Sequence, residues 1–141
     1  MNHSGAVLID TDVCSLVFVA TRPTDARAAA WRRLLLGRQV IVSFQTRAEL
    51  LAGALANNWG HHQILKLHNI IDRIPAIVAD DSVIATYAKF YADCRRSGHA
   101  LHDKKHTGDR WIAACAIAYG LELLAGDKIY ANAPGLSLVR E

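Results

Sequence analysis

The chain has 141 residues, of which 52% are hydrophobic and 21% are charged, with a net charge of +3. This composition argues against an intrinsically disordered protein, and the length favours one domain over residues 1–141. No apolar run reaches the roughly 20 residues that a membrane-spanning helix needs. The three cysteines are widely spaced, which argues against a disulfide framework. We therefore expect a cytoplasmic protein without membrane association.

The first half of the chain alternates short apolar runs with helix-like segments. Residues 6–10 and 40–43 are predicted to be buried strands, because each is a short and continuous apolar run. A helix is expected after the first of these strands, where Thr11 or Asp12 can cap it. Further helices are expected over residues 25–36, 46–55 and 61–72.

The second half continues this alternation. The sequence predicts a short strand at residues 76–78 and then a long helix over residues 81–96. Residues 97–108 are polar and flanked by glycine, which predicts an exposed loop. A helix over residues 110–119 and strands over residues 121–125 and 136–139 complete the chain. Strands that alternate with helices predict an α/β fold whose parallel sheet is covered on both faces.

Four acidic residues are expected near one edge of this sheet. Asp10 and Asp127 directly follow predicted strands, Asp109 begins a helix, and Glu49 lies in the helix after the second strand. Ligands of open parallel sheets bind beyond the carboxyl ends of the strands, so these side chains can meet there. Carboxylates at such short distances repel one another, and a hard divalent cation such as Mg²⁺ or Mn²⁺ offsets this repulsion. Such an ion can activate water and stabilise charge on a transferring phosphate.

Each acid also has an ordinary structural explanation when it is taken alone. Asp10 and Asp109 can cap helices, Glu49 can be a solvated helix residue, and Asp127 can belong to a turn. The hypothesis of a metal site therefore depends on the order and spacing of all four residues. It is also favoured because the chain contains no P-loop and no G-x-S-x-G motif.

The segments that contain these acids resemble a known family, and they cover nearly the whole chain in order: LIDTDV, TRAELLAG, GDRWIAACAIAYG and LLAGDKIY. Together they resemble the PIN-domain ribonucleases, and specifically the VapC-type toxins of toxin–antitoxin pairs. The most specific part is the run Asp-Arg-Trp-Ile-Ala-Ala at residues 109–114, followed at a short distance by a strand and Asp127. The resemblance implies a three-layer α/β/α fold with a central, mostly parallel sheet.

The resemblance also implies an activity. It assigns Asp10, Glu49, Asp109 and Asp127 to the acidic quartet of the family, as catalytic residues and as ligands of Mg²⁺ or Mn²⁺. Water then attacks an RNA phosphodiester and leaves a 5′-phosphate and a 3′-hydroxyl. The implied partners are tRNA or ribosomal RNA as the substrate, a cognate antitoxin that occupies the RNA-binding groove, and a second copy of the chain in a homodimer.

Two positions depart from the commoner pattern of the family. Asp12 stands where members often have Asn or Ser, and we expect it to be an auxiliary acid that touches the metal through water. Ala125 lacks the hydroxyl that often precedes the last acid by two residues. Removal of Asp127 is therefore expected to weaken activity less than removal of the other three acids.

Several basic residues are candidates for contacts with RNA phosphates. Lys104, Lys105 and Arg110 lie close to Asp109 in sequence, and Arg47 precedes Glu49 by two residues. The alternative for each is an ordinary solvated side chain. The three histidines between residues 99 and 106 do not follow a zinc-binding pattern, and no cysteine pair accompanies them.

Two other functions remain as alternatives. The first is a haloacid-dehalogenase-like phosphatase, because Asp10-Thr11-Asp12 resembles its nucleophile loop and Gly126-Asp127 resembles its late acidic motif. That alternative leaves Glu49 and Asp109 without a role. The second is a non-catalytic PIN-like RNA-binding domain, which would have no reason to keep several mutually repelling carboxylates.

Overall fold

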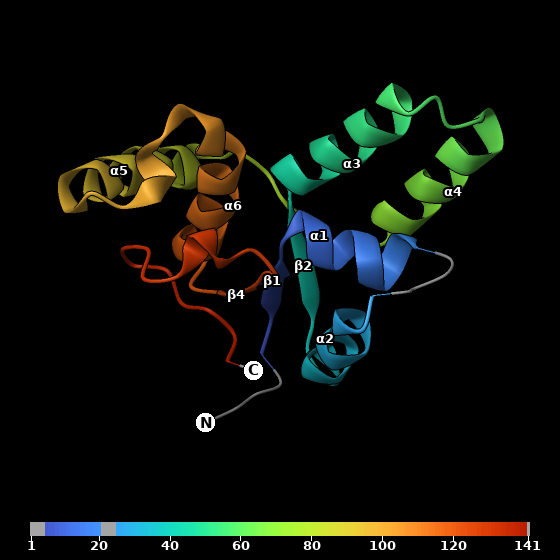
Figure 1. Cartoon of the computed structure of the whole chain (residues 1–141), viewed down its shortest axis with the longest axis horizontal. Helices are drawn as coiled ribbons and strands as arrows, with labels where there is room; N and C mark the ends of the chain where they lie inside the picture. The colour runs from blue at the N-terminus through green and yellow to red at the C-terminus, as the bar shows by residue number, and fades with distance from the viewer. Residues whose placement is uncertain (1–4, 21–24, 141) are drawn as a thin grey trace.

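A four-stranded parallel sheet forms the centre of the protein (Figure 1). The computed structural model describes residues 5–20 and 25–140. Within them the strands lie in the order β3-β2-β1-β4, and each neighbouring pair is parallel. The strands are β1 (Val7–Ile9), β2 (Val40–Ser43), β3 (Ala76–Ile77) and β4 (Glu122–Leu124). The predicted α/β class with a parallel sheet is confirmed.

Helices cover both faces of the sheet, with a helical hairpin beside it (Figure 1). The first helix, α1, is continued by a π-helical segment, η1, and the two pack beside α2 on one face. On the other face α5 and α6 pack against each other. The elements are α1 (Thr11–Cys14), η1 (Ser15–Val19), α2 (Arg27–Leu35), α3 (Phe44–Ala56), α4 (His61–Ile71), α5 (Asp81–Ser97) and α6 (Thr107–Ala118).

Alternate residues of the central strands enter different cores, as the twofold period of a strand requires. Leu8 of β1 and Leu123 of β4 pack with residues of α5 and α6. Val7 and Ile9 of β1 and Leu124 of β4 pack on the opposite face with residues of α1 and α2. The sheet is therefore buried on both sides, which explains why its strands are continuous apolar runs.

Two predicted segments differ from the structure. Residues 136–139 are not a strand, because they join β4 through only two backbone hydrogen bonds and form a single bridge, Leu123 with Leu138. Residues 97–108 are not a simple exposed loop. They contain two short 3₁₀ helices, η2 (Ala100–His102) and η3 (Lys104–His106), and they include the start of α6. The buried side chain of Arg110 holds these turns by donating hydrogen bonds to their backbone carbonyls.

The strand order positions the carboxyl ends of β1 and β4 side by side. The chain moves from β1 to β2 and β3 on one side, then returns to place β4 on the other side of β1. This reversal is the topological switch point at which open α/β sheets form their sites. The backbone amide of Asp10 donates to the carbonyl of Leu124 over 2.9 Å, so the turns after β1 and β4 lie together. Among the described residues, no helix has the length and apolar character needed to cross a membrane.

Candidate active site at the carboxyl edge of the sheet

Asp10 is a buried carboxyl group at the end of β1. Its side chain is N-cap of α1 and accepts a hydrogen bond from the Thr11 amide over 2.7 Å. Asp10 is only 6% exposed. Burial raises its pKa to about 7, against the opposing effect of the Thr11 amide, and the charges of Asp12, Asp109 and Glu49 act in the same direction as burial. Asp10 therefore lies among carboxylates rather than among cations.

Glu49 is brought to this position by α3 and is held by two neighbours. The Thr11 hydroxyl donates to Oε1 over 2.7 Å, and the amide nitrogen of Gln45 donates to Oε2 over 2.9 Å. Since the single proton of Thr11 goes to Glu49, the hydroxyl of Thr46, 3.0 Å away, donates to Thr11. Thr46 in turn accepts from the hydroxyl of Ser43, the N-cap of α3. A chain of hydroxyl groups thus links the ends of β1 and β2 and orients Glu49.

Asp109 lies in the first turn of α6 and also has two neighbours. The ring nitrogen Nδ1 of His106 lies 2.9 Å from Oδ2, and the hydroxyl of Tyr130 donates to Oδ1 over 3.2 Å. The preceding Gly108 packs directly on α3. A Cβ atom at Gly108 would lie 2.8 Å from Nε2 of Gln45 and 3.0 Å from Oε2 of Glu49. The absence of a side chain there allows Asp109 and Glu49 to approach each other.

The side chains of Asp12 and Asp127 accept hydrogen bonds from backbone amides in the turns after β1 and β4. The carboxylate of Asp127 accepts from the Ile129 amide over 2.9 Å and caps a short 3₁₀ helix, η4 (Lys128–Tyr130). Asp12 accepts from the Val13 amide over 2.8 Å and from the Gly126 amide over 3.1 Å. Burial raises the pKa of Asp12, against these two hydrogen bonds. The structure therefore gathers Asp10, Glu49 and Asp109, places Asp12 beside them, and engages Asp127 in a cap.

The three gathered acids fit a hard divalent cation by their chemistry. Their donors are carboxylate oxygens, which Mg²⁺ and Mn²⁺ prefer. In the part of the chain that the structure describes, neither Asp10 nor Glu49 pairs with a basic side chain. Within the same residues, no three His, Cys, Asp or Glu side chains are already close enough to hold an ion. A cation would thus supply positive charge beside Asp10 and Glu49, and it would draw the carboxylates together.

The four basic residues that the sequence suggested for contacts with RNA differ in their surroundings. The prediction that Arg110 contacts RNA is wrong, because this residue is only 4% exposed. Its guanidinium donates to the carbonyls of Leu101 and Asp103, each over 2.6 Å, and so holds η2 and η3. Lys104 and Lys105 are exposed on η3, where contact with RNA stays a prediction.

Arg47 has a partner within the protein. It forms an ion pair of 2.7 Å with Asp72, which directly follows α4. This pair links the two helices of the hairpin, and the side chain of Arg47 is 37% exposed. The contact between Arg47 and RNA that the sequence suggested stays a prediction, because the ion pair with Asp72 already explains the position of this side chain.

Sequence reasoning missed the residues that orient the acids. Thr11 and Gln45 hold Glu49, while His106 and Tyr130 hold Asp109. His106 had a signal in the sequence, since it lies three residues before Asp109 near a helix start, where such pairs meet. Tyr130 had no such signal in the sequence, because its contact with Asp109 depends on how the turn after β4 packs against α6.

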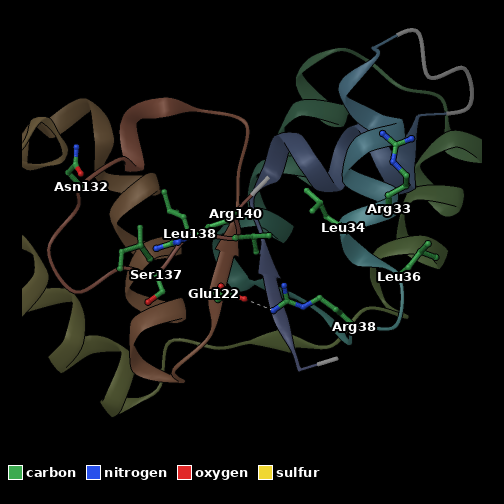
Figure 2. A pocket seen from close by; sticks show the side chains of 11 residues that line it. Arg33, Leu34, Leu36, Arg38, Glu122, Asn132, Ser137, Leu138 and Arg140 are labelled. Atoms are coloured by element: carbon green, nitrogen blue, oxygen red, sulfur yellow. Dashed lines mark hydrogen bonds and ion pairs between the residues drawn. The ribbon is translucent and has the colours of Figure 1, made fainter. Parts of the chain in front are cut away.

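A separate pocket lies at the opposite, amino end of the strands (Figure 2). It has a volume of about 1110 Å³ and is lined by the end of α2 and by the C-terminal segment. Arg38, which precedes β2, forms an ion pair of 2.8 Å there with Glu122 at the start of β4. Arg33 and Arg140 also line this pocket. The acidic group is at the other edge of the sheet, so the pocket does not belong to the candidate active site.

Gly126 offers a test of the packing around Asp12. A Cβ atom there would clash with the carboxylate of Asp12 and lie 2.9 Å from Cζ2 of Trp31, a side chain that is only 1% exposed. Because the Trp31 ring is buried and cannot move freely, Gly126→Ala should lower the free energy of unfolding by about 1–3 kcal/mol. Urea denaturation measures this loss.

The matched control for Gly126 is Gly53→Ala in α3. A Cβ atom at Gly53 meets nothing within 4 Å. Alanine is the better helix former by up to about 1 kcal/mol, so this variant should be as stable as the wild type or more stable. Equal stability of the Gly126→Ala variant and the wild type would show that the turn after β4 is not packed as described.

Comparison with known proteins gives a family match and several similar structures. The model of the PIN domain family matches residues 7–136. The structure of FitAcB from Neisseria gonorrhoeae is 24% identical over 95% of this chain and 96% of that chain, with a TM-score of 0.74. DNA-bound VapBC from Salmonella typhimurium is 18% identical over 95% and 96%, with a TM-score of 0.76. VapBC-5 from Mycobacterium tuberculosis is 23% identical over 96% and 98%, with a TM-score of 0.70.

These structural similarities show a shared fold at low sequence identity. The search of curated proteins found no match. The resemblance to the PIN domain that the sequence suggested is confirmed by the family match, which spans most of the chain.

Proposed function

This chain belongs to the PIN-domain family, and we propose that it is a Mg²⁺- or Mn²⁺-dependent endoribonuclease that hydrolyses RNA phosphodiester bonds. One observation carries the proposal: the buried carboxyl of Asp10 lies at the topological switch point among the charges of Glu49 and Asp109. A carboxyl in this environment has its pKa raised to about 7, and its ionised form would be favoured by a cation.

The proposed roles follow from the contacts of each acid. Asp10, Glu49 and Asp109 would hold the divalent cation, which when bound supplies an activated water and stabilises charge on the phosphate. Thr11 and Gln45 orient Glu49, and His106 and Tyr130 orient Asp109, so each carboxylate can present an oxygen in a fixed direction. Asp12 adds negative charge beside Asp10.

The chemistry proposed is a simple hydrolysis. The oxygen of water forms a bond to phosphorus while the bond from phosphorus to the 3′-oxygen breaks. Water loses a proton as its oxygen bonds to phosphorus, and the 3′-oxygen takes a proton and leaves as a hydroxyl. The phosphate stays attached to the 5′-oxygen of the downstream fragment. Lys104 and Lys105 are exposed on η3, close in sequence to Asp109, and would contact the phosphates that flank the cleaved bond.

The biological role that we propose is that of a toxin neutralised by a cognate antitoxin. The similar structure from Mycobacterium tuberculosis is described as a member of the VapBC family of toxin–antitoxin systems, and another is a toxin–antitoxin complex from Klebsiella pneumoniae. From the family resemblance of the sequence we further propose a homodimer that cleaves tRNA or ribosomal RNA. Co-purification with the product of an adjacent gene that encodes a small DNA-binding protein would support this role.

The geometry of the site does not support the phosphatase alternative. In that alternative Val42-Ser43 would be the motif of a strand followed by a hydroxyl. The Ser43 hydroxyl is fully buried and caps α3 by accepting from the Thr46 amide over 3.0 Å. The carboxylate of Asp127 is engaged in the cap of η4. The buried Ser43 hydroxyl is therefore not accessible to a phosphate in this structure.

Asp109→Asn tests the proposed activity. The variant keeps the shape of the side chain and removes its charge, so RNA cleavage with Mn²⁺ should fall at least about 100-fold. The rate is measured on end-labelled RNA, with an EDTA blank. The matched control is Asp93→Asn in α5, an acid that pairs with Lys89 and lies outside the site, and this variant should cleave like the wild type.

Three results would contradict the proposal. Cleavage by Asp109→Asn at the wild-type rate would show that the site is elsewhere. Binding of RNA by the wild type without cleavage in Mg²⁺ or Mn²⁺ would favour the non-catalytic alternative. Release of phosphate from a small phosphomonoester, with RNA left intact, would favour the phosphatase.

A further inference from the structure

Tyr130 is a buried tyrosine whose hydroxyl reaches into the acidic group. Its side chain is 1% exposed, and the hydroxyl donates to Oδ1 of Asp109 over 3.2 Å. The hydroxyl therefore serves Asp109 as a hydrogen-bond donor from a buried position.

Two donors from different parts of the chain constrain the Asp109 carboxylate. His106, one turn before it, approaches Oδ2, and Tyr130 approaches Oδ1 from the turn after β4. Contact with both oxygens restricts rotation of the carboxylate, whereas one contact would leave it free to turn. Carboxylates that hold metal ions are commonly oriented by such hydrogen bonds.

Asp127 caps the short turn that carries Tyr130. Its carboxylate accepts from the Ile129 amide and caps η4, which ends at Tyr130. The same turn is closed by the Ala131 amide, which donates to the Lys128 carbonyl over 3.0 Å. The ring nitrogen Nε2 of His99 lies 2.9 Å from the Ala131 carbonyl and joins the turn to the segment after α5. Asp127 is thus bound to the turn that carries Tyr130.

We propose that Tyr130 is a positioning residue for Asp109, and that Asp127 acts by capping the turn that carries Tyr130 rather than as a metal ligand. This inference rests on the proposed function, since it concerns the metal affinity of the same site. It changes the role that the family resemblance assigns to Asp127. It gives a physical reason for the expectation that removal of Asp127 weakens activity less than removal of the other three acids.

The competing explanation is that Tyr130 only fills the core. Tyr130 packs with Leu101 and Ile112, among other residues of the α5 and α6 side. Tyr130→Phe separates the two explanations, because it keeps the ring and removes only the hydroxyl. A residue that only fills the core would lose nothing at the metal site when its hydroxyl is removed.

The experiment measures Mn²⁺ affinity by isothermal titration calorimetry, together with thermal unfolding in EDTA. Tyr130→Phe should weaken Mn²⁺ binding about 10-fold, the lower end of the range for partners of metal ligands, while its unfolding midpoint stays within about 2 °C of the wild type. The matched control is Tyr119→Phe. The Tyr119 hydroxyl also donates to a carboxylate, that of Asp80, outside the acidic group, so this variant should bind Mn²⁺ normally.

Substitutions of Asp127 test the second half of the proposal. Asp127→Asn keeps an oxygen that can accept from the Ile129 amide, so Mn²⁺ affinity should stay within about 3-fold of the wild type, unlike the loss expected for a ligand. Asp127→Ala loses the cap and should weaken Mn²⁺ binding about as much as Tyr130→Phe. The double variant Asp127→Ala/Tyr130→Phe should be no weaker than either single variant, because both act through one contact.

Each contrary outcome has a distinct meaning. If Tyr130→Phe binds Mn²⁺ as tightly as the wild type, Tyr130 is only a core residue and the inference is overturned. Equal and large losses in Asp127→Asn and Asp127→Ala would make Asp127 a ligand, which also overturns it. If the wild type itself binds no Mn²⁺, the proposed metal site fails and this inference fails with it.

Discussion

Asp10→Asn is expected to abolish RNA cleavage and, in the same protein, to raise the stability of the metal-free form at pH 8. The loss of cleavage follows from removing a proposed ligand, and it should reach at least about 100-fold. The gain in stability follows from the environment of the carboxyl. Asp10 is 6% exposed, and its pKa is raised from 3.8 to about 7 by burial and then by neighbouring carboxylates.

The pH dependence of this gain has a definite sign. The unfolded chain ionises Asp10 near its ordinary pKa of 3.8, whereas the folded chain keeps the proton until about pH 7. Between these values the folded state binds more protons, so wild-type stability falls as the pH rises. The Asn side chain of the variant does not ionise, so the variant does not lose stability in this way. Its advantage should be small near pH 4, grow through pH 7 and then level off, at up to about 4 kcal/mol.

Urea denaturation in EDTA at a series of pH values measures this advantage. Asp93→Asn in α5, at an acid that lies outside the site and pairs with Lys89, is the control. Its difference in stability from the wild type should show no comparable rise between pH 4 and pH 7. Saturating Mn²⁺ should stabilise the wild type and reduce the advantage of Asp10→Asn, because only the wild type keeps the full ligand set. An Asn variant less stable than the wild type at pH 8 in EDTA would contradict the electrostatic description of the site.

Among the substitutions proposed for this protein, Arg110→Met is expected to cause the largest loss of stability. The buried guanidinium donates to the carbonyls of Leu101 and Asp103, to the Thr107 hydroxyl and to the Tyr87 hydroxyl. Methionine can fill much of the space but leaves these groups without their donor. The free energy of unfolding should fall by about 2–5 kcal/mol, because buried acceptors without a partner are costly.

Arg96→Met is the matched control for this loss. The Arg96 side chain, at the end of α5, is 79% exposed, so its substitution should change stability by less than about 0.5 kcal/mol. Hydrogen exchange adds a local measurement, since amides of η2 and η3 should lose protection in Arg110→Met before those of the sheet. If the two arginine variants are equally stable, Arg110 does not hold these turns.

The Arg110 result illustrates where sequence reasoning about this chain succeeded and where it failed. Its position beside Asp109 and in a basic stretch suggested an exposed contact with RNA. The sequence does not show that two carbonyls of the preceding turns point inward and need a donor. These turns lie against α5 and α6, so their surroundings depend on contacts between segments that are distant in the sequence.

Much of the fold could be predicted because the sequence patterns that indicate it are local. Continuous apolar runs mark β1, β2 and β4 as buried strands, and capping residues such as Asp80 mark helix starts. The last predicted strand failed because residues 136–139 have suitable side chains, but backbone pairing reaches only the bridge at Leu138. Strand pairing depends on a partner elsewhere in the chain, which a local pattern does not specify.

The sequence by itself determined that acids would follow the strands at one edge of a parallel sheet, because strand ends and helix starts are local features. Only the tertiary structure decided which of them meet. It brings Asp10, Glu49 and Asp109 together, places Asp12 against the Gly126 amide, and uses Asp127 to cap the turn that carries Tyr130. The physical reason is that each carboxylate takes the donors within its reach, and Tyr130 comes to Asp109 from a segment whose path is set by packing.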